Sequence, residues 1–175
     1  MQINLSELFT HVGKERTYTR DIEMEQFQAL DGAYEIVERR PVVLTIRHSG
    51  ERKLEIEGKI ELSLMIPCSR CLQPVRNDFS LNVQASVDIN QTEEERAQEL
   101  NEQPFISGYY LDVDQLVHNE LLLNLPMKVL CNENCKGICN RCGANLNYES
   151  CSCESSSLDP RMSVIQDIFK QFKEV

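Results

Sequence analysis

The sequence predicts an α+β protein, in which an antiparallel β meander or partly open barrel is followed by an amphipathic helix, a cysteine-rich segment and a C-terminal helix. Three observations predict this class. Apolar and polar residues alternate over much of 42–89, as in half-buried strands. Apolar residues then recur at helical spacing over 111–125. Beyond that helix, six of the eight cysteines fall between Cys131 and Cys153.

The β-rich part is expected over residues 1–90. The run 42–48 has the composition of a strand, and the alternation over 54–66 predicts one long strand or a bent pair of strands. Gly58 interrupts this alternation and marks an expected bulge or bend. A further alternation over 79–89 predicts the next strand. The polar segment before residue 30 carries no clear pattern.

An acidic insertion or linker is expected over residues 91–110. Thr92 and Glu95 match a capping box, which favours a helix, but a mobile insertion fits equally well. Residues 88–120 hold nine acidic side chains and one basic side chain, in a chain of net charge −10. Such a stretch either attracts a basic protein or keeps the chain soluble. No run of Lys and Arg is present, which disfavours extended binding to a phosphate backbone.

A helical and zinc-binding part is expected over residues 111–175. Asp112 and Asp114 lie where carboxylates suit the start of the first helix, and Pro126 ends it. Asp159 as N-cap, followed by a proline, predicts the final helix. We expect the three parts to form one integrated domain, 1–175.

The zinc prediction depends on the spacing of the cysteines. Cys68-x2-Cys71 and Cys139-x2-Cys142 are short loops that return two thiolates to one ion, and a tetrahedral zinc site needs four such ligands. The remaining ligands are Cys131, Cys135, Cys151 and Cys153. Redox-active thiols and unliganded thiols are the alternatives.

Two divisions of the eight cysteines are open. We favour a local site of Cys139, Cys142, Cys151 and Cys153, which close over a short stretch, and a second site of Cys68, Cys71, Cys131 and Cys135. In the crossed division, Cys68 and Cys71 join Cys139 and Cys142. Either way, zinc with four protein ligands is structural and leaves no open position for a substrate.

The N-terminus has no basic segment followed by an apolar one, and no run of residues is long and apolar enough for a membrane span. We therefore expect a cytoplasmic protein without membrane association. Stable disulfides are rare in that compartment, which favours metal-binding cysteines.

Other chemical groups give weaker signals. No motif combines His11, His48 or His118 with a nucleophile, and no phosphate-binding or dinucleotide motif is present, so no catalytic residue is expected. Lys136 and Arg141 are candidate binding residues because they are basic side chains within the cysteine-rich segment.

Several motifs, taken in order, resemble the YceD family, the large ribosomal RNA subunit accumulation proteins. They are Cys68-Ser-Arg-Cys-Leu72, Glu120-Leu-Leu-Leu-Asn-Leu-Pro126, Cys135-Lys-Gly-Ile-Cys-Asn-Arg-Cys-Gly-Ala-Asn-Leu-Asn147, Cys151-Ser-Cys153 and Asp159-Pro-Arg161. The resemblance runs from about Val42 to the C-terminus. It implies a small cytosolic factor of ribosome biogenesis, with no enzymatic activity, needed for large-subunit ribosomal RNA to accumulate. Some members keep the first thiol loop and lack the later cysteine elements.

Three functional hypotheses follow. The first is a non-catalytic, zinc-stapled scaffold that binds a ribosomal protein or a large-subunit precursor particle and no small-molecule substrate. The second is a thiol oxidoreductase or redox-switched chaperone, which needs an accessible cysteine of low pKa. The third is a zinc ribbon that contacts RNA directly through a thin basic set, Lys128, Lys136, Arg141 and Arg161.

Overall fold

The fold is mostly antiparallel β-sheet, as expected. The computed structural model describes residues 2–50, 53–88 and 103–153, and these ranges hold two antiparallel sheets, one α-helix and a short 3-10 helix. The helix expected after Asp159 and the capping box at Thr92 lie outside the described residues.

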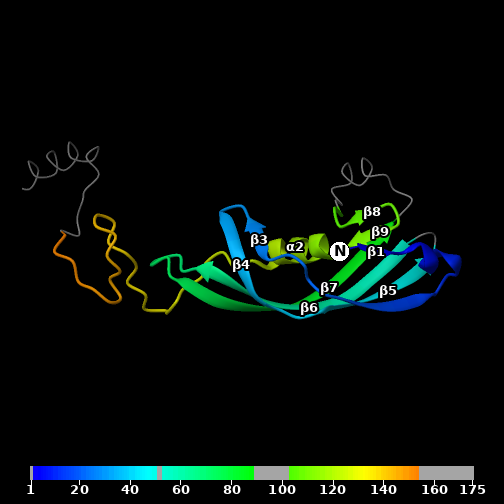
Figure 1. Cartoon of the computed structure of the whole chain (residues 1–175), viewed down its shortest axis with the longest axis horizontal. Coiled ribbons are helices and arrows are strands. Elements are labelled where there is room, and N and C mark those ends of the chain that lie inside the picture. The colour runs from blue at the N-terminus through cyan, green and yellow to red at the C-terminus, as the bar shows by residue number, and fades with distance from the viewer. Residues whose placement is uncertain (1, 51–52, 89–102, 154–175) are drawn as a thin grey trace, which may run out of the picture.

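The large sheet has the strand order β2-β5-β6-β4-β3, and β7 also pairs with β6. Its strands are β2 (Glu15–Arg20), β3 (Gln26–Ala29), β4 (Gly32–Arg39), β5 (Val42–Gly50), β6 (Lys53–Pro67) and β7 (Pro74–Asp88). Along one edge of β6, β5 pairs with the first half and β4 with the second, while β7 follows the other edge from Lys53 to Pro67. The β6–β7 hairpin is therefore the long central pair of strands on which the rest of the large sheet is built (Figure 1).

Alternation in sequence correctly located β5, β6 and β7. Of the bulge or bend expected at Gly58, the bulge was wrong. The register of β6 runs without a shift past Gly58, which faces Leu44 on β5 and Val83 on β7. Gly58 is required by close packing instead: a Cβ there would lie 2.5 Å from the carbonyl oxygen of Val43. The register shifts of the sheet occur on β4 and at the end of β5.

A second layer covers the inner face of the large sheet. It consists of the small sheet β1-β9-β8 and helix α2, with β1 (Gln2–Asn4), η1 (Ser6–Thr10), β8 (Ile106–Ser107), β9 (Tyr110–Asp112) and α2 (Val113–Asn124). The Asp112 side chain accepts a hydrogen bond from the Gln115 amide and caps α2. Buried side chains of α2, β1 and the large sheet form one apolar core.

The sequence-based prediction placed this helix correctly, with a slightly longer range. The four apolar positions Val113, Leu116, Val117 and Leu121 are buried as the periodicity predicts. After α2 the chain runs back along the sheet to the β6–β7 turn, and the cysteine-rich segment extends beyond that end (Figure 1). This path brings Cys131 and Cys135 close to Cys68 and Cys71.

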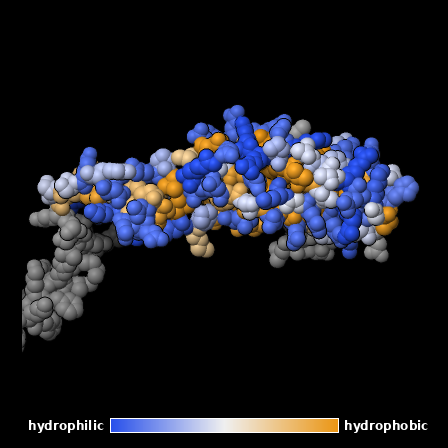
Figure 2. Space-filling view, turned by 90° about the horizontal axis from the view of Figure 1, so that it is seen from below, coloured by the Kyte–Doolittle hydropathy of each residue, from blue (hydrophilic) through white to orange (hydrophobic). Residues whose placement is uncertain are grey.

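The surface of the wider part is mostly hydrophilic on the face seen in Figure 2, with small separate hydrophobic areas. Among the described residues, none of the helices has both the length and the hydrophobicity needed to cross a membrane.

Candidate metal centres

The first cysteine cluster joins the β6–β7 turn to the segment after α2. The four sulfurs of Cys68, Cys71, Cys131 and Cys135 lie within 4.8 Å of one another. The Sγ atoms of Cys68 and Cys135 are 3.8 Å apart, and those of Cys71 and Cys131 are 3.5 Å apart. Cys68, Cys71 and Cys135 are buried where the sheet end meets the later segment, whereas Cys131 is exposed.

Backbone hydrogen bonds shape the first knuckle, which we define as residues 68–73. The Cys68 amide donates to the Gln73 carbonyl (2.8 Å), which continues the β6–β7 ladder into the turn. The Leu72 amide donates to the Cys68 carbonyl (2.9 Å), and Leu72 adopts a φ of 61°. The Arg70 amide points at the Cys68 sulfur at 3.5 Å. The turn thus presents both sulfurs on one side.

Further hydrogen bonds hold the later segment against this knuckle. Ser69 exchanges two with Val129: its amide donates to the Val129 carbonyl (2.8 Å), and its hydroxyl accepts from the Val129 amide (3.2 Å). The Arg70 guanidinium donates to the carbonyl of Cys135 at 2.7 Å. Arg70 therefore acts as a cross-link between the two halves of the cluster.

The second cluster is local and more exposed. Cys139, Cys142, Cys151 and Cys153 bring their sulfurs within 4.8 Å of one another, and Cys139 alone among them is buried. The second knuckle, residues 139–144, repeats the first: the Gly143 amide donates to the Cys139 carbonyl at 2.9 Å, and Gly143 has a φ of 75°. The eight sulfurs are thus grouped as in the division we favoured, and not in the crossed one.

Both clusters mix thiols of low and high pKa. Burial raises the pKa of the Cys68 thiol, but hydrogen bonds from neighbouring backbone amides outweigh it and lower the pKa to about 6. Backbone amides of the second knuckle likewise lower the pKa of Cys139 to about 6. Hydrogen bonding to a neighbouring cysteine raises the pKa of Cys131 and of Cys153 to about 12. Each cluster therefore contains one cysteine that ionises easily and one that keeps its proton unless a cation is bound.

The geometry fits a tetrahedral metal ion. A zinc–sulfur distance of about 2.3 Å places the sulfurs of a tetrahedron about 3.8 Å apart, and the separations of 3.5 and 3.8 Å in the first cluster agree with this. A disulfide requires sulfurs about 2.0 Å apart. Four sulfur ligands suit zinc or another thiophilic metal, and they leave no coordination position for a substrate.

Asn147 contacts the first cluster in a way that the sequence did not reveal. Within its own turn, the Asn145 side chain accepts a hydrogen bond from the Asn147 amide at 3.0 Å. Asn147 also donates through Nδ2 to the sulfur of Cys135 at 3.3 Å, and its Oδ1 accepts from the Lys136 amide at 2.8 Å. A long-range contact of this kind leaves no periodic signal in a sequence.

The two predicted binding residues, Lys136 and Arg141, are exposed and flank Cys139 in sequence. Their side chains are not among the ligand groups of either sulfur cluster, although the backbone amide of Arg141 is one of those that lower the pKa of Cys139. Their predicted role in binding a partner stays a prediction.

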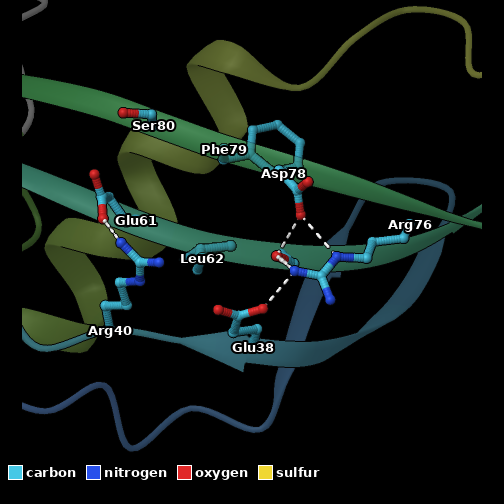
Figure 3. A pocket seen from close by; sticks show the side chains of 9 residues that line it. Glu38, Arg40, Glu61, Leu62, Arg76, Asp78, Phe79 and Ser80 are labelled. Atoms are coloured by element: carbon cyan, nitrogen blue, oxygen red, sulfur yellow. Dashed lines mark hydrogen bonds and ion pairs between the residues drawn. The ribbon is translucent and has the colours of Figure 1, made fainter.

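A shallow pocket of about 290 Å³ lies on the outer face of the large sheet (Figure 3). Arg40 is paired there with Glu61 at 2.7 Å, and Arg76 is paired with Asp78 at 2.8 Å and with Glu38. Lys59 also pairs with Glu61 at 2.5 Å, so every charged group that lines the pocket has a partner of opposite charge.

Comparison with known proteins places the chain in a family. The sequence model described as "Large ribosomal RNA subunit accumulation protein YceD" matches residues 56–169. A maize relative, "Large ribosomal RNA subunit accumulation protein YCED homolog 1, chloroplastic", is 24% identical over 161 residues, which cover 75% of this chain and 55% of the relative. An Arabidopsis thaliana protein of the same name is 27% identical over 64 residues, covering 37% of this chain and 20% of the relative.

A Bacillus subtilis relative, "Uncharacterized protein YlbN", is 23% identical over 121 residues, or 69% of each chain. The chain thus spans about half the length of the maize relative and more of the bacterial one. No solved structure shows a significant match. Because the family model matches well over half of the chain, including all eight cysteines, the chain belongs to the YceD family.

Proposed function

We propose that this protein is a non-catalytic factor of ribosome biogenesis that supports the accumulation of large-subunit ribosomal RNA. Family membership supports the role in ribosomal RNA accumulation, since the family and its maize and Arabidopsis members are named for it. The two clusters of four thiols support a structural role, because a metal held by four sulfurs is coordinatively saturated.

Loss of the gene tests the role in the cell. We expect a lower ratio of large-subunit to small-subunit ribosomal RNA, restored by the wild-type chain but not by Cys71→Ser/Cys131→Ser, which lacks two ligands of the first cluster. Asn124→Ala, a change at the exposed end of α2, is the matched control and should restore the ratio. An unchanged ratio after gene loss would refute the proposed role.

Zinc is the proposed metal in both clusters. When bound, it would supply two positive charges to each cluster of thiolates and fix the segments that carry them. Cys68 and Cys71 would hold the first ion on the end of the β6–β7 hairpin. Metal analysis of reduced, freshly purified protein should find two zinc ions per chain, and freshly purified protein that contains no metal but is ordered at both clusters would refute this assignment.

The proposed partner is a basic ribosomal protein or a large-subunit precursor particle containing one. Residues 88–120 carry nine acidic side chains and one basic side chain, which complements a cationic protein. In this mechanism the acidic region holds the ribosomal protein until ribosomal RNA, a stronger polyanion, takes it over.

Affinity capture at several salt concentrations tests this mechanism. Glu93→Gln/Glu94→Gln/Glu95→Gln should recover less ribosomal protein and lose much of the salt dependence. The matched control removes three exposed carboxylates elsewhere, with Glu35→Gln/Glu57→Gln/Glu149→Gln. Equal recovery by both variants would refute the acidic docking site.

A thiol redox function is the second candidate, favoured by the pKa of about 6 at Cys68 and Cys139. Both side chains are buried, at 0% and 8% exposure, which opposes attack on an external disulfide. Rapid alkylation of the metal-loaded protein at either cysteine would favour redox chemistry. Resistance until a chelator is added would favour the scaffold.

A further inference from the structure

The two clusters share a short junction. Residues 136–138 separate Cys135 of the first cluster from Cys139 of the second. On one side of this junction, the Ile138 amide donates to the Arg70 carbonyl of the first knuckle at 3.2 Å. On the other side, the Leu146 amide donates to the Gly137 carbonyl at 2.9 Å. The junction is thus sandwiched between the first knuckle and the loop that belongs to the second cluster.

Packing at the junction is tight. Gly137 is buried with a φ of 81°, and a Cβ there would lie 3.1 Å from the Arg70 carbonyl oxygen. The Tyr148 hydroxyl donates to the Gln73 side chain at 3.2 Å, which adds a second contact between the later loop and the first knuckle. The position of the second-cluster loop is therefore set by the first knuckle.

Asn147 connects the two clusters most directly. It lies between Cys142 and Cys151 of the second cluster, yet its Nδ2 donates to the Cys135 sulfur of the first at 3.3 Å. Its Oδ1 holds the Lys136 amide at 2.8 Å. One exposed side chain thus binds both a ligand atom of one cluster and the backbone that leads to the other.

The clusters differ in how they are supported. The first is built on the β6–β7 hairpin, and three of its four cysteines are buried. All ligands of the second come from residues 139–153, and one of its four cysteines is buried. An ion in the first cluster would therefore order the junction, so that an ion in the second would bind a loop that is already in place.

We propose that metal binding at the two clusters is positively coupled through Asn147, which acts as a positioning residue for both. This inference rests on the proposed metal binding. Coupling between sites in proteins typically changes affinity by about 5- to 150-fold and is reciprocal. We expect a coupling factor in this range.

Zn²⁺ titration against a chromophoric chelator measures the coupling in the full-length, reduced chain. Cys142→Ser/Cys153→Ser leaves only the first site, and Cys71→Ser/Cys131→Ser leaves only the second. The coupling factor is the overall two-ion constant of the intact chain divided by the product of the two single-site constants. Asn147→Ala is then introduced into all three proteins, and Asn132→Ala, which removes a side chain that caps Asn134 within the first-cluster loop, is the matched control.

Asn147→Ala should reduce the coupling factor to within twofold of one, whereas Asn132→Ala should leave it unchanged. A purely structural weakening would lower a single-site constant, but it would cancel from this ratio. In the Co²⁺-loaded first-site protein, Asn147→Ala should also shift the sulfur-to-cobalt charge-transfer band to longer wavelength, because the Cys135 sulfur loses a hydrogen bond.

A coupling factor near one in the intact chain, or one that Asn147→Ala does not change, overturns this inference and leaves the metal sites intact. Binding of fewer than two ions by the intact chain overturns the proposed metal sites, and the coupling with them. Unchanged circular dichroism of the sheet confirms that each variant retains its fold.

Discussion

At the scale of single residues, the two knuckles have the same backbone conformation but place different residues at its position of positive φ. Both close with an amide-to-carbonyl hydrogen bond of 2.9 Å, and both place the residue after the second cysteine at positive φ. The second knuckle uses Gly143 there, whereas the first uses Leu72, whose side chain is 63% exposed. Glycine is the residue expected at positive φ, because it has no Cβ. A leucine in this conformation could not be predicted, because nothing local in the sequence marks it.

Leu72→Gly tests the cost of this conformation against Leu72→Ala. Both variants remove the exposed side chain, but only alanine keeps the Cβ that is unfavourable at positive φ. We expect the glycine variant to be more stable than the alanine variant by about 1 kcal/mol. Urea denaturation followed by circular dichroism measures the difference, and identical midpoints would show that the turn carries no strain.

The thiol pKa values make proton release on metal binding depend on pH. At pH 7, Cys68 and Cys139, with pKa values of about 6, are already ionised, whereas Cys131 and Cys153, at about 12, must lose protons. Below pH 6, Cys68 and Cys139 must lose theirs too, so zinc binding should release about two more protons per chain at pH 5 than at pH 7. Titration in weak buffer counts these protons. Equal release at both pH values would contradict the lowered pKa of these thiols.

At the scale of secondary-structure elements, β6 is the strand to which most of the large sheet is attached. Its alternation was readable in the sequence because one face is buried from Leu54 to Ile66 at every position except Gly58. Strand β2 escaped prediction because its sequence, Glu-Arg-Thr-Tyr-Thr-Arg, has no fully buried position and pairs with β5 as an edge. Periodicity in one strand does not show which other strand it pairs with, and β2 is defined by its pairing with β5. For the same reason the close approach of β5 to Gly58 could not be predicted, and a bulge was wrongly expected there.

Gly58→Ala should destabilise the sheet. The added Cβ would lie 2.5 Å from the Val43 carbonyl oxygen and 2.6 Å from the Leu44 side chain, so β5 must move away from β6. We expect a loss of about 1–3 kcal/mol of unfolding free energy, typical of overpacking. Asn82→Ala, at an exposed position on neighbouring β7, is the control and should change stability little. A stability equal to that of the control would rule out the clash.

At the scale of the whole molecule, the fold consists of a sheet core and a cysteine-rich extension joined at the first cluster. The sequence-based prediction of the two cysteine groups was correct because short loops close locally, which left Cys131 and Cys135 for the early pair. Cys131 and Cys135 lie close to Cys68 because α2 directs the chain along the sheet. The spacing of cysteines in the sequence does not predict this path. The side chains of Lys136 and Arg141 are not ligand groups of either cluster, so their predicted role needs a partner to test it.

Metal removal should affect these two regions unequally. The sheet is held by its own apolar core, whereas the apolar cluster around Cys68, Cys71 and Cys135 adds only Val75 and Leu130. After chelation, hydrogen exchange should therefore rise in residues 68–73 and 129–148 but stay slow in β5 and β6. Loss of protection throughout the sheet would instead show that the metal sites and the sheet fold as one unit.

The paired length of β6 and β7 has a further consequence. A 15-residue strand extends about 50 Å, and the first cluster lies at one tip of this hairpin while the small sheet packs toward the opposite half (Figure 1). Two molecules bound at the opposite ends of this hairpin, one of them at the thiol-bearing tip, would therefore lie about 50 Å apart.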